Sequence, residues 1–334
     1  MPINKITVNG RTLIDLSHDT VDKDSLLLNN TAHKNTGQII SGAAVEYPGS
    51  DYYLDSDGIL HRIKVDRPPC RLRVMTYNTG GWYIGSHTNV PDDKVETYLA
   101  IQRHIMETQS PDIAVFQEYW YYFNQGNTIV SKDVLDRYFG DIYQFDVHST
   151  SYGKAMASKS LPFTDYAHYR FNVYVDNPTY GNTYYYGFEK GHINVNGKQI
   201  CIINTWLDSS DTYWSERESE VAQLLSFVAT EPYFILMGDF NVDCPNGTSD
   251  THYTSFIKPF VDAGYNVYNN AVRDGSFRQI STYYRADGTH EALDQIITSS
   301  NITVENVFID RTKLDDLVDE KVDHVPFLAD LIIN

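Results

Sequence analysis

From residue 71 onward, short apolar runs alternate with helical patterns, and this alternation limits the fold more than any other feature of the chain. The runs "RLRVMTYN", "IAVFQE" and "FILMGDFN" are typical of strands that enter a core. Helical spacing of apolar residues follows in residues 92–112 and 215–228. Strands and hairpins with helices between them predict an α/β (α+β) fold built as a layered sandwich.

The first part of the chain follows a different pattern. Residues 1–46 contain short strand-like runs around an Asn-Gly turn, which predicts a small, mostly β module. Residues 47–70 are rich in turn residues and are interpreted as a connector or an edge hairpin. The remaining residues, 71–334, are expected to form one larger domain.

Composition excludes several classes of protein. No apolar stretch approaches the roughly 18 residues of a membrane helix, so no transmembrane segment is expected, and the N-terminus shows no secretory signal. The three cysteines lie far apart, without the spacing of a metal site, and are interpreted as reduced thiols. The formal net charge of -18 opposes non-specific attraction to a polyanion, but a cation held by carboxylates would supply local positive charge.

Polar residues recur where the apolar runs end. They are Asn78, Glu118, Asn204, Asp239, Asn241, Asp294, Asp323 and His324. Each one alone is an ordinary turn or cap residue. Period-two geometry would place Asp239 and Asn241 on one face of their strand, and Gly238 would leave room for the close approach of backbone or ligand.

The order of these motifs resembles a known family. The motifs are "VMTYN" (74–78), "PDIAVFQE" (111–118), "IINTWLD" (202–208), "ILMGDFN" (235–241), "LDQII" (293–297) and "VDHVPF" (322–327). Together they resemble the endonuclease/exonuclease/phosphatase superfamily, which has the deoxyribonuclease I-like fold, over about residues 71–334. The resemblance implies a four-layer α/β sandwich and metal-dependent hydrolysis of phosphate esters.

The residue types suit that chemistry. The carboxylate of Glu118 is expected to bind Mg²⁺ or Mn²⁺, and Asn78 either adds a neutral oxygen ligand or holds that carboxylate. Asp239 is the candidate to orient or deprotonate the attacking water, and Asn241 is expected to donate to the phosphate.

The acid group is assigned through the resemblance. His324, flanked by Asp323, resembles the family histidine that stabilises the transition state or protonates the departing oxygen. Asp294 resembles the family aspartate that supports a histidine or polarises the site. Which aspartate partners the imidazole stays open at this point.

One position departs from the family pattern. Many members read "NTHL", whereas this chain reads "NTWLD", with Trp206 in place of the histidine. Indole donates one hydrogen bond but cannot shuttle a proton. Trp206 and Asn204 are expected to contact substrate, the alternative being that Trp206 only packs at the rim. Arg285 and Lys154 stay outside the catalytic set, and Asp243 is interpreted as a loop residue beyond the site.

A nuclease acting on DNA is the expected function. The alternatives are a sphingomyelinase-like lipid phosphodiesterase and a phage structural protein with a decayed enzyme fold. The Tyr-rich segment 178–188 fits a stacking surface or a lipid interface equally well. Residues 10–42 also resemble modules of phage and prophage tail proteins. That second resemblance implies tail proteins as partners and a virion or tail location; without it, a cytoplasmic location is expected.

Overall fold

The computed structural model divides the chain into two units, Met1–Pro68 and Pro69–Asn334. Outside the strands of the first unit, it describes residues 70–80, 92–123, 126–129, 132–146, 153–173, 175–177, 182–184, 186–285, 287–311 and 324–334. Only the backbone is described for the strands of the first unit and for residues 92–98, 120–129 and 175–184.

The described residues of the first unit form short antiparallel strands. β1 pairs with β2, β3 pairs with β4, and β5, β6 and β7 form a three-stranded sheet. Their bounds are Lys5–Val8, Arg11–Asp15, Thr31–His33, Ile39–Ser41, Val45–Glu46, Tyr52–Leu54 and Leu60–Arg62. The hairpin of β6 and β7 lies in the segment 47–70 and is grouped with the N-terminal strands.

Two six-stranded sheets form the centre of the second unit. The first sheet has the order β12-β13-β9-β8-β27-β26, and the second has the order β14-β17-β18-β19-β25-β20. In the first sheet the bounds are Gln144–Asp146, Ala155–Ser158, Ile113–Gln117, Cys70–Asn78, Phe327–Ile333 and Ile302–Ile309. In the second they are Thr164–Arg170, Gly187–Val195, Lys198–Trp206, Phe234–Asp239, Asp294–Thr298 and Asn266–Val267.

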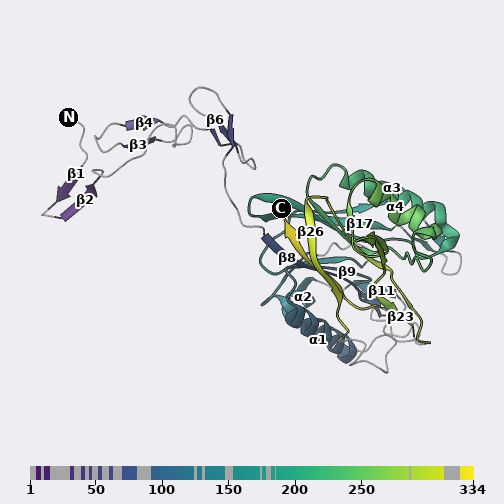
Figure 1. The fold of residues 1–334 in the computed structure, drawn as a ribbon. Helices are drawn as coiled ribbons and strands as arrows, with labels where there is room; N and C mark the ends of the chain where they lie inside the picture. The colour runs from purple at the N-terminus through teal and green to yellow at the C-terminus, as the bar shows by residue number, and fades with distance from the viewer. Residues whose placement is uncertain are drawn as a thin grey trace. The chain divides into compact units, whose positions relative to one another are not determined.

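Helices lie on the outer sides of the sheets. Figure 1 shows α1 (Asp92–Gln109) and α2 (Lys132–Phe139) on one side of the unit, and α3 (Trp214–Val228) with α4 (Lys258–Asp262) on the other. None of the described helices is long and apolar enough to cross a membrane. Short helical turns occupy Asp211–Tyr213, Gly247–Ser249 and Tyr253–Ile257.

Among the residues that the structure describes, four further hairpins belong to the second unit. They pair β10 (Trp120–Phe123) with β11 (Gly126–Ile129), β15 (Val175–Asn177) with β16 (Asn182–Tyr184), β21 (Ala271–Arg273) with β22 (Ser276–Arg278), and β23 (Tyr283–Tyr284) with β24 (His290–Glu291).

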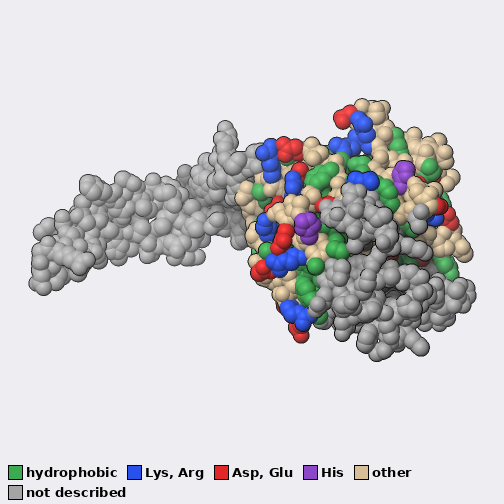
Figure 2. Space-filling model, turned by 90° about the horizontal axis from the view of Figure 1, so that it is seen from below, with side chains coloured by type: hydrophobic (Ala, Val, Ile, Leu, Met, Phe, Trp, Pro, Cys, Tyr) green, Lys and Arg blue, Asp and Glu red, His purple; other side chains and the backbone are tan. Residues whose placement is uncertain are grey.

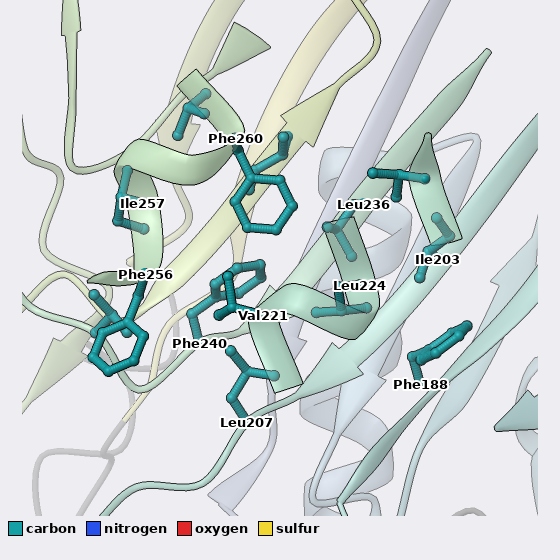
Figure 3. Close-up of a cluster of buried hydrophobic side chains, with 14 of the residues drawn as sticks. Phe188, Ile203, Leu207, Val221, Leu224, Leu236, Phe240, Phe256, Ile257 and Phe260 are labelled. Atoms are coloured by element: carbon teal, nitrogen blue, oxygen red, sulfur yellow. The ribbon is translucent and has the colours of Figure 1, made fainter. Parts of the chain in front are cut away.

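Alternation along each strand separates three apolar layers. In β8, Val74 packs between the two sheets, whereas Met75 packs under α1 and α2. In β19, Ile235 likewise faces the other sheet, whereas Leu236 packs under α3 and α4. Figure 3 shows that outer layer, in which Leu236 lies near Leu224 of α3 and Phe260 of α4. The order helix, sheet, sheet, helix confirms the predicted four-layer α/β sandwich.

The same alternation brings polar residues to the space between the sheets. Asn78 follows Val74 by four positions, and Asp239 follows Ile235 by four, so both continue the inner faces of their strands. Asp294 precedes the inner-face residue Ile296 by two positions on the antiparallel partner β25, where it lies opposite Asp239. Burial of the apolar inner faces therefore fixes where the polar strand ends meet.

Candidate active site

A cavity of about 390 Å³ opens where these strands end. Its lining is dominated by charged and polar side chains: Glu118, Trp206, Ser209, Asp211, Asp239, Asn241, Asp243, His252, Tyr283, Arg285, Glu291, Leu293 and His324. Five of these residues are carboxylic acids and one is an arginine, so the cavity attracts cations.

Asn78 joins two carboxylates on one side of the cavity. Its Nδ2 donates to Asp239 Oδ2 at 2.9 Å and to Glu118 Oε1 at 3.1 Å. Its Oδ1 accepts from the Gly80 backbone N–H at 2.9 Å, which fixes the orientation of the amide. The amide nitrogen of Asn78 therefore faces the carboxylates. Of the two expected roles, an oxygen ligand to the metal or a donor that holds Glu118, the geometry favours the donor.

A histidine–aspartate pair lies next to Asp239. His324 Nδ1 is 2.9 Å from Asp294 Oδ2, and His324 Nε2 is 3.7 Å from Asp239 Oδ2. The Asp294 contact directs Nε2 toward Asp239 and the cavity. Among the described residues, Asp294 is thus the carboxylate paired with His324, and Asp323 lies outside the described residues.

The strand β23, which carries Tyr283, orients His324. The two residues form a β-bridge, and their rings make an edge contact with centroids 4.9 Å apart. Thr282 accepts a hydrogen bond from the Asp294 backbone N–H, and its carbonyl accepts one from Val325 N–H. Neither Thr282 nor Tyr283 was predicted from the sequence, because nothing in "STYY" distinguishes it from ordinary strand residues.

Burial changes the acidity of Asp239. The side chain is 1 % exposed, and desolvation raises the pKa of its carboxyl to about 7, while nearby His324 lowers this pKa and Asp294 raises it. A proton-accepting carboxylate with a pKa near neutrality suits the activation of water.

Two site residues have left-handed backbone. Glu118 has φ 50° and Asn241 has φ 51°, a region that non-glycine residues seldom adopt. The strand ends at Asp239, so period-two alternation does not extend to Asn241, contrary to the prediction. Asn241 instead reaches the cavity through this turn, which the hydrogen bond from its N–H to Asp239 Oδ1 holds.

Hydrogen bonds hold the Asn241 turn on its outer side as well. Asn241 Nδ2 donates to Leu207 O at 2.9 Å, and a second amide hydrogen remains for a ligand. The fully buried Arg217 on α3 donates to Asn241 O at 3.0 Å. Arg217 was missed because its position in "SERESEV" is typical of an exposed helix face.

Gly238 is required by the neighbouring strand. Its φ is 152°, and a Cβ at this position would lie 2.0 Å from the Thr205 carbonyl oxygen in β18. The sequence predicted that Gly238 leaves room for either backbone or a ligand, and the structure shows that the Thr205 backbone occupies this space.

Asn204 does not line the cavity, so the predicted substrate contact is wrong. Its side chain is fully buried, and Nδ2 donates to the carbonyls of Phe116 and Ala155 in the first sheet. Its Oδ1 accepts from Gln117 Nε2 at 2.7 Å. With these groups satisfied inside the protein, Asn204 links the two sheets behind the site.

Trp206 does line the cavity, at the end of β18. Its ring makes an edge contact with Tyr186, with centroids 5.1 Å apart. Arg285 also lines the cavity and pairs with Glu291 at 2.9 Å, whereas Lys154 is fully buried. Asp243 was expected beyond the site but lies on the cavity wall, where its Oδ1 accepts from the Ala292 N–H.

The donor set fits a hard divalent cation. Glu118 and Asp239 present carboxylate oxygens 2.9–3.1 Å from one amide nitrogen, so both groups face the same small volume. Oxygen-rich sites of this kind suit Mg²⁺ or Mn²⁺. Glu118 would hold the ion, with Asp239 beside it.

Fold and site together define a two-sheet α/β sandwich with a carboxylate–histidine cavity at one end. The chain belongs to the Endonuclease/Exonuclease/phosphatase family, whose model matches residues 75–317. Members of this family are typically hydrolases of phosphodiester bonds, and many use divalent metals. A search of curated proteins finds no match.

Solved structures share the fold at low identity. The human Nocturnin catalytic domain with bound sulfate anion is 18% identical, with a TM-score of 0.56 over 79% of this chain and 94% of that one. D. rerio TDP2 complexed with single strand DNA product is 12% identical, with a TM-score of 0.56 over 78% and 98%. An endonuclease/exonuclease/phosphatase from Bacteroides vulgatus is 15% identical, with a TM-score of 0.55 over 79% and 100%.

The raised pKa of Asp239 predicts a pH-dependent stability difference. The pKa of its carboxyl is about 7 in the folded protein but about 3.9 in an unfolded chain. The folded protein therefore loses free energy of unfolding as the pH rises from about 3.9 to about 7, because the unfolded chain releases this proton more readily. Asp239→Asn should therefore stabilise the metal-free protein by roughly 1–3 kcal/mol more at about pH 8 than at about pH 5. Urea unfolding with a chelator present measures this, and an equal effect at both pH values would contradict it.

Proposed function

We propose that the protein is a divalent-metal-dependent phosphodiesterase that cleaves DNA. The observation that carries the proposal is the convergence of Glu118, Asp239 and the Asp294–His324 pair on one cavity. Phosphodiester hydrolysis needs an activated water, neutralisation of the phosphate oxygens and a proton for the leaving oxygen. Each requirement has a candidate group here.

The proposed roles follow from the positions of the groups. Asp239 orients the attacking water and accepts its proton, with its carboxylate held by Asn78 and by the Asn241 N–H. Asn241 donates its second amide hydrogen to a phosphate oxygen. A Mg²⁺ ion on Glu118 would neutralise charge on the phosphate.

His324 serves the departing oxygen in this proposal. Its Nδ1 is engaged by Asp294, so a proton on Nε2 points into the cavity. Asp294 positions the ring, as a carboxylate partner does for other catalytic histidines. The His324 side chain is 5 % exposed, so the ring is largely shielded from bulk solvent.

Two observations support nucleic acid as the substrate class. The edge-packed pair of Trp206 and Tyr186 places aromatic rings beside the cavity, and aromatic rings stack on bases without regard to sequence. The D. rerio TDP2 structure of the same fold holds a single strand DNA product. On the face in Figure 2, the coloured Lys and Arg side chains lie among Asp and Glu, and the cavity itself is lined by five carboxylic acids and one arginine. We therefore propose that stacking and the bound cation supply more of the affinity than a basic surface does.

A substrate panel tests this proposal. Plasmid DNA, sphingomyelin and a chromogenic phosphodiester should be incubated with Mg²⁺, with Mn²⁺ and with a chelator. We expect nicking of DNA that the chelator abolishes and no release of phosphocholine. Turnover of sphingomyelin alone would replace DNA by a lipid substrate. No turnover of any substrate with either metal would support a decayed enzyme.

For residues 1–46 we propose attachment to a virion or tail structure. This proposal rests only on the sequence resemblance to phage tail modules, and the family model begins later, at residue 75.

A further inference from the structure

Three side chains of different chemistry meet on the second sheet, away from the cavity. They are His192 in β17, Cys201 in β18 and Glu231 in the turn after α3. One potential ligand atom from each lies within 4.8 Å of the others. Cys201 is fully buried, and the His192 and Glu231 side chains are 16% and 17% exposed.

The fold determines this meeting. His192 and Cys201 lie directly opposite each other in the antiparallel pair of β17 and β18. Both point to the outer face, because their neighbours Ile193 and Ile202 face the other sheet. The turn of Glu231 leads into β19, and the Cys201 N–H donates to Tyr233 O at 2.9 Å, which brings Glu231 beside Cys201.

The distances suit a tetrahedral ion. His192 Nε2 is 3.3 Å from Glu231 Oε2, and the Cys201 sulfur lies within 4.8 Å of both of these ligand atoms. Nitrogen and oxygen ligands at zinc bond lengths of about 2.0–2.1 Å and a tetrahedral angle stand about 3.3 Å apart. The ligand pair already has that separation before any ion enters.

We propose that His192, Cys201 and Glu231 bind a Zn²⁺ ion, with water as the fourth ligand. A thiolate and an imidazole favour zinc over Mg²⁺, so this site differs in selectivity from the cavity. The thiolate and the carboxylate together balance the two positive charges of the ion. Binding breaks the S–H bond of Cys201, forms an S–Zn bond and releases the proton to the solvent.

The site would stabilise the sheet that carries the cavity. Cys201 lies five positions before Trp206 in β18, or about 17 Å along the strand, so the ion does not contact the cavity. It would connect β17, β18 and the segment leading into β19, which ends at Asp239. The expected consequence is higher thermal stability without a change in reaction chemistry.

Binding of Co²⁺ distinguishes this site from the cavity, because none of the described residues that line the cavity is a cysteine. The full chain, stripped of metal and kept reduced with excess Mg²⁺, should be titrated with Co²⁺ and followed by near-ultraviolet absorption. A thiolate ligand gives an intense charge-transfer band, whereas carboxylate and imidazole ligands do not. We expect this band to saturate at one equivalent of Co²⁺ and Zn²⁺ to bleach it by displacement.

Matched variants assign the band. Cys201→Ser should abolish it, and Cys244→Ser, which replaces another buried thiol, should leave it intact. His192→Gln and Glu231→Gln each remove one ligand and keep the buried cysteine. Each should weaken Co²⁺ binding by at least about 100-fold, because losing even an outer-shell partner of a ligand costs up to that much. Circular dichroism verifies that each variant is folded.

The overturning results are equally specific. A wild-type protein without the band, a band that survives in folded Cys201→Ser, or unchanged affinity in both His192→Gln and Glu231→Gln would overturn the proposal. None of these outcomes bears on phosphodiester cleavage, because Asp239 and His324 are unchanged in every variant.

Discussion

Replacing His324 by glutamine is expected to lower kcat on a phosphodiester by about 10²–10⁴-fold, the usual contribution of a positioned acid or base. Glutamine keeps a hydrogen-bonding group of similar reach but cannot deliver a proton at neutral pH. Because Asp294 holds the ring, 2.9 Å from Nδ1, and is assigned no contact with the substrate, Asp294→Asn should cost less than His324→Gln. Steady-state rates on a chromogenic phosphodiester measure both effects.

The double variant gives the sharper result. If Asp294 works through His324, then His324→Gln with Asp294→Asn should be no slower than His324→Gln alone, since the two residues act as one unit. Additive losses would show that Asp294 has a separate role. Asp262→Asn, a change to an exposed carboxylate in α4, serves as the matched control and should retain the wild-type rate.

Replacing Glu118 by glutamine is expected to weaken Mg²⁺ binding by at least about 100-fold, since losing even an outer-shell partner costs up to that much. The amide removes a charged oxygen ligand while keeping the size of the side chain. Titration calorimetry on metal-free protein measures the affinity directly, independently of turnover. The rate at saturating Mg²⁺ should recover in part, because the reacting groups Asp239 and His324 remain.

Glu107→Gln provides the control for this experiment. Glu107 is an exposed carboxylate on α1 that pairs with Arg103, so its change alters net charge equally without touching the cavity. Equal Mg²⁺ affinity in the Glu118→Gln and Glu107→Gln proteins would show that the ion binds elsewhere.

Strand alternation made much of this site predictable. Inner-face apolar residues at Val74 and Ile235 dictate that Asn78 and Asp239, each four residues later, face the other sheet. The pairing of Asp239 with Asp294 in neighbouring strands follows from the same rule once the sheet order is known. Local sequence identified the candidates, and the sheet order brought them together.

The errors arise where tertiary packing decides the outcome. Asn204 continues an inner face as Asp239 does, but the first sheet covers it, and only the structure shows this. Asp243 returns to the cavity wall because its turn folds back onto Ala292, far away in the sequence. Arg217 is buried and donates to the carbonyl of the Asn241 turn, a contact that no helical pattern reveals.

Diffraction from crystals soaked in Mn²⁺ and inorganic phosphate tests the central claim most directly. An anomalous peak is expected within about 2.2 Å of a Glu118 carboxylate oxygen, with phosphate density between Asn241 and His324. The Glu118→Gln protein should lose the peak under the same soak. A manganese peak or phosphate bound outside the cavity, with the cavity empty of both, would contradict the account.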